Sequence, residues 1–139
     1  MKRNTRKRIY NRITQAQNYL KERNNKDKVD SFLEKYYQCE LAATECIFDY
    51  RLDKKEEEKE IRIIVSTVKA ALNHAGLNAK ESLLNYLFAA NDKRGQRSAK
   101  RLRNAIVHEI SVTDMREVNN RFYELKEYMA EFLRTFDIE

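Results

Sequence analysis

The chain contains no proline and only 2 glycines among its 139 residues. Proline interrupts helices, and glycine supplies many of the tight turns that connect β-strands, so a chain that nearly lacks both favours long helices. No segment alternates apolar and polar residues in the manner of a half-buried strand. We therefore expect an all-α fold, a single-domain helical bundle of about five or six helices that spans residues 1–139.

Apolar residues at helical spacing outline the individual helices. The expected helices span about 5–21, 27–50, 61–72, 83–88, 98–109 and 115–136. Gly76 should end the third helix, because glycine readily adopts the left-handed conformation that follows a helix. Thr113 is the predicted N-cap region of the last and clearest helix. The charge run 54–60 has mixed signs and is expected to be a solvated helix start or connection.

The basic residues are concentrated in two places. The formal net charge is +6, with five basic residues in the expected N-terminal tail 1–8 and six, with no acid among them, over 93–103. Such clusters point to a polyanionic partner, such as nucleic acid or a membrane surface. No apolar run is long enough to cross a membrane. Cys39 and Cys46 lie two helical turns apart, too far for a disulfide, so we expect buried free thiols and a reducing, cytoplasmic location.

The expected helix 98–109 has two distinct faces. At about 100° per residue, one face is apolar and the opposite face carries cations, an amide and an imidazole. The apolar face consists of Ala99, Leu102, Ile106 and Ile110, and the polar face consists of Arg97, Arg101, Asn104 and His108. His108 should therefore lie outside the core, among groups suited to a phosphodiester.

The run Arg103-Asn104-Ala105-Ile106-Val107-His108 resembles the signature of HEPN domains, in which an Arg precedes a His by four to six intervening residues and a polar residue often follows the Arg. The resemblance implies a small bundle of long helices and a metal-independent endoribonuclease. It also implies a homodimer in which each copy contributes Arg103 and His108 as a catalytic pair, with Asn104 as an orienting group. Expected contacts to the RNA backbone come from Lys93, Arg94, Arg97, Lys100 and Arg101.

The chemistry fits these residue types. Histidine can remove the proton of an RNA 2′-hydroxyl near neutral pH, and a guanidinium can hold the charge that develops on the phosphoryl oxygens. The expected products are a 2′,3′-cyclic phosphate and a free 5′-hydroxyl. No glycine-rich phosphate loop, His-Glu metal motif or Ser-His-Asp pattern is present in the sequence, so we expect neither metal nor cofactor.

Helix geometry separates the two groups within one chain. Arg103 and His108 are five residues apart, hence roughly 140° apart around an ideal helix. Either the long Arg side chain wraps around the helix, or a second copy brings its own helix. Val107 would then lie near a two-fold contact.

Other interpretations stay open at this stage. HEPN domains that bind without cutting exist, so a non-catalytic module for RNA or protein and a helical regulator are the alternatives. A toxin or phage-defence role with an antitoxin is possible, but some HEPN toxins carry a Tyr, modified by a nucleotidyltransferase antitoxin, where this chain has Ile110. Glu40 or Glu45 could orient His108.

Overall fold

The computed structural model describes residues 3–22, 25–55, 60–93, 95–108 and 111–137. The described residues form seven helices: α1 (Arg3–Lys21), α2 (Asn25–Asp53), α3 (Val65–His74), α4 (Glu81–Phe88), α5 (Ala99–His108), α6 (Val112–Asn120) and α7 (Phe122–Arg134). They contain no strand, only an isolated β-bridge between Lys93 and Gln96. The all-α expectation is confirmed, whereas the expected count of five or six helices is wrong. No described helix combines the length and apolarity needed to cross a bilayer.

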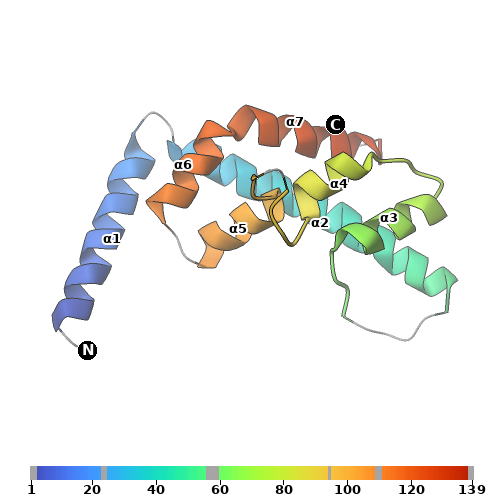
Figure 1. Ribbon diagram of the computed structural model, residues 1–139, viewed down its shortest axis with the longest axis horizontal. Coiled ribbons are helices and arrows are strands. Elements are labelled where there is room, and N and C mark those ends of the chain that lie inside the picture. The colour runs from blue at the N-terminus through green and yellow to red at the C-terminus, as the bar shows by residue number, and fades with distance from the viewer. Residues whose placement is uncertain (1–2, 23–24, 56–59, 94, 109–110, 138–139) are drawn as a thin grey trace.

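Helix α2 is the central element of the fold. It lies along α7 over much of its length, and α3, α5 and α6 pack against other parts of it (Figure 1). Its core-facing residues recur at intervals of three and four, the spacing of one helical face: Val29, Phe32, Tyr36, Cys39, Ala43 and Ile47. This face meets Leu125, Met129 and Phe132 of α7 in one continuous hydrophobic core.

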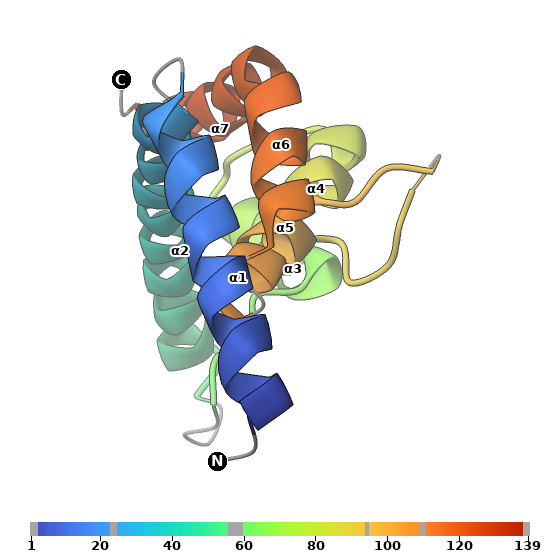
Figure 2. The same cartoon turned by 90° about the vertical axis from the view of Figure 1, so that its left-hand side faces the viewer.

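Helix α1 extends away from this bundle, and its C-terminal end is the part that packs on the core (Figures 1 and 2). Tyr19 and Leu20 are partly buried there, but Ile9 is 41% exposed and Ile13 is 51% exposed. The sequence pattern predicted this helix and its apolar stripe, of which Ile9 and Ile13 stay exposed. The expected basic tail 1–8 is helical from Arg3 onward.

The third helix is shorter than its apolar pattern indicated. It begins at Val65, so Ile61 and Ile64 lie in the segment before it, where Ile61 still packs against the core. The turn after α3 matches the prediction, because Gly76 has a φ of +75°, in the left-handed region. Most of the mixed-charge run 54–60 falls on residues 56–59, which lie outside the described residues.

The final helix is divided in two, contrary to the single helix expected over 115–136. The division is at Arg121, whose φ of −101° and ψ of 10° depart from helical values. Its guanidinium donates to the Arg97 carbonyl over 2.9 Å and to Glu117 over 2.7 Å, which holds the bend against the start of α5. The predicted cap was also misplaced: Ser111, not Thr113, caps α6 and accepts from the Asp114 amide over 3.1 Å.

The two cysteines differ in their surroundings. Cys39 is buried between α2 and α7, and its thiol donates to the Met129 carbonyl over 3.7 Å. Burial raises the pKa of Cys39 to about 12, because the thiolate would lose its hydration. Cys46 is only partly buried. The expectation of free thiols is met, and that of burial holds fully for Cys39.

Candidate functional site

Helix α5 begins at a well-defined cap. Ser98 is buried, and its hydroxyl donates to the Ala89 carbonyl over 2.6 Å while accepting from the Arg101 amide over 3.2 Å. Together these bonds satisfy an amide of the first helical turn and tie α5 to the end of α4. Behind the cap, Leu102 and Ile106 are buried, so the apolar face of α5 packs inward as the periodicity predicted.

Arg103 is held by three groups of its own chain. Its guanidinium donates to Glu40 on α2 over 2.9 Å and to the Asn104 side-chain oxygen over 2.7 Å. It also lies over the ring of Tyr36, 5.8 Å from the centroid. A guanidinium has five N–H donors, and these two hydrogen bonds leave roughly three for another ligand. Arg103 is therefore fixed in place without being saturated.

His108 lies on a different face of α5 from Arg103. It is exposed, as the helical periodicity predicted, and forms no hydrogen bond or ion pair with another described residue. It lines an open hollow of about 400 Å³ together with Arg97, Lys100, Arg101, Asn104 and two alanines. The polar face expected from the sequence thus forms one surface around His108.

The predicted RNA-contacting cations are mostly engaged with other protein groups. Arg97 forms ion pairs with Asp114 over 2.8 Å and Glu117 over 2.7 Å, and the Asp114 side chain is only 7% exposed. Lys100 donates to the Ile63 carbonyl over 3.0 Å, and Arg101 pairs with Asp92. Arg97 therefore serves mainly to hold α6 against the start of α5. Lys100 is different, because a carbonyl does not neutralise its charge.

The last two candidates lie on the loop before α5. Lys93 is exposed and contacts no described acidic residue, so it is available to a phosphate. Arg94 lies outside the described residues. The same holds for Ile110, the position at which the sequence departs from the toxin pattern.

Arg103 and His108 do not line a common pocket within one chain. Asn104 lies between them, because it accepts from Arg103 and also lines the hollow beside His108. Val107 is 50% exposed next to His108, which leaves an apolar group at the open end of α5. The hollow beside His108 therefore contains the guanidinium groups of Arg97 and Arg101, and the Arg103 guanidinium lies outside it.

The two glutamates considered for orienting His108 have other positions. Glu40 holds Arg103 and so belongs to the site, although through the arginine. Glu45 lines a separate apolar groove with Leu41 and Phe136. Among the described residues, no three His, Cys, Asp or Glu side chains gather as metal ligands.

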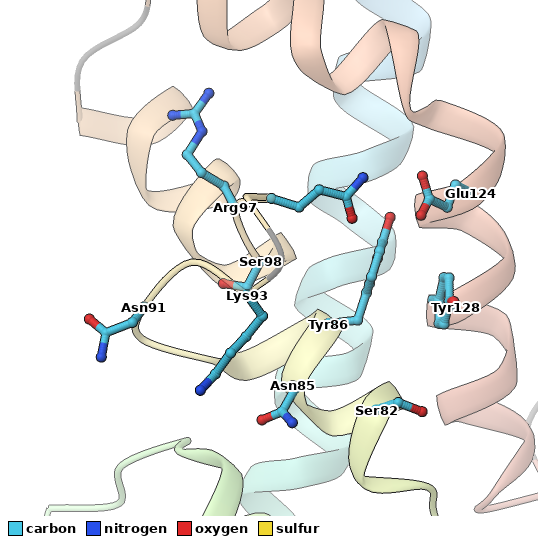
Figure 3. A pocket seen from close by; sticks show the side chains of 10 residues that line it. Ser82, Asn85, Tyr86, Asn91, Lys93, Arg97, Ser98, Glu124 and Tyr128 are labelled. Carbon is cyan, nitrogen blue, oxygen red and sulfur yellow. The ribbon is translucent and has the colours of Figure 1, made fainter.

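A second pocket opens beside the loop before α5 (Figure 3). Its volume is about 420 Å³, and α4, the loop and α7 contribute its walls. Tyr86 of α4 and Tyr128 of α7 stack there, with ring centroids 4.0 Å apart and planes 16° apart. Arg97 lies at the border of both pockets but turns away from the tyrosines. Sequence analysis missed this pocket, because Tyr86 and Tyr128 are 42 positions apart and neither belongs to a motif.

Comparison with known proteins gives no match for this chain: no protein-family model, no curated protein and no solved structure matches it. The function of the site is therefore argued from its residues and their geometry.

Proposed function

We propose that the chain is a metal-independent endoribonuclease of the HEPN type, which acts as a homodimer on single-stranded or loop RNA. The observation that carries the proposal is the arrangement on α5: His108 is exposed in a basic hollow, and Arg103, about 1.4 turns earlier, is held by Glu40 and Asn104. This gives a free general base and a preorganised guanidinium on one short helix, the two groups that cleavage of RNA by its own 2′-hydroxyl requires.

The proposed reaction needs no group from outside the protein and the RNA. The His108 imidazole takes the proton of the 2′-hydroxyl while that oxygen attacks the adjacent phosphorus. Arg103 donates its remaining N–H groups to the phosphoryl oxygens, on which negative charge increases. The bond from phosphorus to the 5′-oxygen breaks, and an imidazolium supplied by the second copy protonates that oxygen. The products are a 2′,3′-cyclic phosphate and a 5′-hydroxyl.

A two-fold dimer resolves the separation of the two groups. Because Arg103 and His108 face different sides of α5, juxtaposing the open ends of two α5 helices places the groups of one copy near those of the other. Val107, half exposed beside His108, is the apolar residue that such a contact would cover. Lys93 and Lys100 retain positive charge along the approach to this end and suit the RNA backbone.

The test is cleavage of total RNA in excess EDTA, followed by analysis of the product ends. Arg103→Ala and His108→Ala should each lower the rate by at least about a hundredfold, the scale of losing one transition-state donor or one acid-base group. The matched controls are Arg62→Ala and His74→Ala, which change an exposed arginine and the other histidine. Loss of wild-type cleavage in EDTA, or full cleavage by His108→Ala, contradicts the proposal.

One observation favours a binding module without catalysis, the second candidate. Glu40 already occupies part of the Arg103 guanidinium, so the arginine has a structural role whether or not RNA is cut. In this case RNA association survives His108→Ala, and no cyclic phosphate forms with either protein.

A toxin or phage-defence role follows from the nuclease proposal as a cellular consequence. Expression of the wild-type chain in bacterial cells should then arrest growth, and His108→Ala should relieve the arrest at equal protein levels. An antitoxin or other regulatory protein would be found as a protein that restores growth in the presence of the wild-type chain.

A further inference from the structure

The polar pocket beside Tyr86 and Tyr128 has the features of a ligand site that the nuclease proposal does not use. Its volume of about 420 Å³ lies within the range of small-molecule sites. Three side-chain amides line it, those of Asn85, Asn91 and Gln96, and none of them forms a hydrogen bond with a described residue. Unpartnered amides around one opening offer donors and acceptors to an incoming group.

The charges around this pocket balance. The charged residues that line it are Lys93, Arg97 and Glu124. Behind this lining, Arg97 and Arg121 lie beside Asp114 and Glu117, so six charged groups, three of each sign, surround the pocket. Four of these six groups neutralise one another directly, because Arg97 and Arg121 pair with Asp114 and Glu117. The pocket therefore does not select an anion, and a phosphate alone would gain little there. A neutral, flat, hydrogen-bonding group suits it better.

The tyrosine pair supplies an aromatic wall for such a group. Tyr128 covers one face of Tyr86 at a centroid distance of 4.0 Å, and the Arg121 guanidinium lies 5.3 Å from the Tyr86 ring centroid. Burial raises the pKa of Tyr86 to about 12, so the phenol stays neutral at physiological pH. Figure 3 shows Tyr86 opposite Tyr128, with Asn85 of α4 and Lys93 of the loop nearby. Aromatic side chains with amide groups are what proteins use to hold unpaired bases.

The pocket also lies at a suitable distance from His108. Ser98 lines it at the start of α5, and His108 ends the helix ten residues later, which is about 15 Å at 1.5 Å per residue. At about 3.4 Å per nucleotide in a stacked strand, this distance corresponds to roughly four nucleotides. Arg97 borders both pockets, so the two openings are neighbours. One RNA strand could occupy both pockets at the same time.

We propose that this pocket binds an unpaired nucleobase of the RNA strand, a few nucleotides from the phosphodiester placed at His108. The inference rests on the proposed nuclease function for the identity of the strand. Adenine is the expected base, because Asn and Gln amides pair with its amino group and a ring nitrogen together, and Glu124 can accept from the same amino group. The pocket would then decide where along an RNA the protein cuts.

The experiment measures binding separately from cleavage. A fluorescein-labelled single strand of ten adenosines is titrated into His108→Ala protein, in EDTA, and anisotropy is recorded. The pocket variant adds Asn85→Ala and Gln96→Ala, and the control variant adds Asn73→Ala and Gln38→Ala, an exposed Asn and Gln outside this pocket. The pocket variant should bind roughly tenfold more weakly, because a well-placed pair of hydrogen bonds between a side-chain amide and a base is worth about 1–3 kcal/mol. The control should bind like its parent.

Replacing the ten adenosines by ten uridines should also weaken binding to the parent, and should change binding to the pocket variant much less. Equal affinity of the pocket and control variants for the adenosine strand overturns the inference, as does the absence of any binding to it.

The two proposals fail separately. If wild-type protein cleaves RNA in EDTA but the pocket variant binds normally, the base site is wrong and the nuclease assignment stands. If RNA binding depends on the pocket but the wild-type protein does not cleave RNA, the nuclease assignment is wrong. The pocket is then the base-binding site of a non-catalytic RNA-binding module.

Discussion

The two ends of α5 differ in how the rest of the chain holds them. At the first end, Ser98 caps the helix and Arg97 pairs with two acids of α6, while Arg103 in the middle is fixed to α2. At the other end, Val107 and His108 are exposed and contact no other described side chain through a hydrogen bond or ion pair. The basic residues at this short helix therefore do not all have the same role. Those at its start build the fold, and the histidine at its end is available to a ligand or a second copy.

Among substitutions that test this difference between the two ends, Arg97→Met should cause the largest loss of stability. Arg97→Met should lower the free energy of unfolding by about 2–3 kcal/mol, because nearly buried Asp114 loses its cation while Glu117 keeps only Arg121. Urea denaturation at pH 7 measures the loss, and Lys93→Met on the exposed loop is the matched control. A loss no greater than that of the control would mean that Arg97 is not structural and would return it to the list of RNA contacts.

A smaller effect is expected at the middle of the helix. Arg103 and Glu40 are each about one quarter to one third exposed, so solvent weakens their ion pair. A double-mutant cycle with Arg103→Met and Glu40→Gln should give a coupling free energy of about 1 kcal/mol in urea denaturation. Glu45→Gln on the same helix should show no coupling to Arg103→Met. Coupling of similar size at Glu45 would show that the measurement reports general charge and not this contact.

The smallest effect on the fold is expected at the open end. Val107→Glu places a charge on a side chain that is already half exposed, so the helical circular dichroism of the chain should not change. Its effect should instead be on assembly, since two copies of the new carboxylate would meet across a two-fold contact. Under the proposed dimer, sedimentation velocity should therefore show a dimer for the wild type and a monomer for the variant, with RNA cleavage reduced in parallel. A wild-type chain that is monomeric at all concentrations would remove the composite site.

The sequence allowed the helix-by-helix outline to be predicted because periodicity is a local property. The buried positions of α5 and the exposure of His108 follow from residues within three turns of one another. The division between α6 and α7 could not be predicted in this way. The apolar pattern continues through Arg121 without interruption, and the bend depends on a carbonyl of Arg97, 24 positions earlier.

The candidate site was predictable to a similar extent. The motif located Arg103, Asn104 and His108 on one helix, but Glu40 lies 63 positions before Arg103, and nothing in its spacing identifies it as the partner. The RNA contacts of the basic run stay a prediction. The sequence does not show which of its cations pair with acids, since Arg97 has the pattern of a surface cation until Asp114 and Glu117 are placed beside it. Long-range pairing decides which charges remain free, and a single sequence does not contain that information.

The buried thiol of Cys39 can report how often the bundle opens locally. Because its sulfur sits against the Met129 carbonyl in the seam between α2 and α7, an alkylating reagent can reach it only when that seam parts. In a Cys46→Ser background, the rate of Cys39 alkylation at pH 8 would therefore report how often α2 and α7 separate. RNA that clamps two copies together should slow that reaction, and RNA that leaves the helices undisturbed should not.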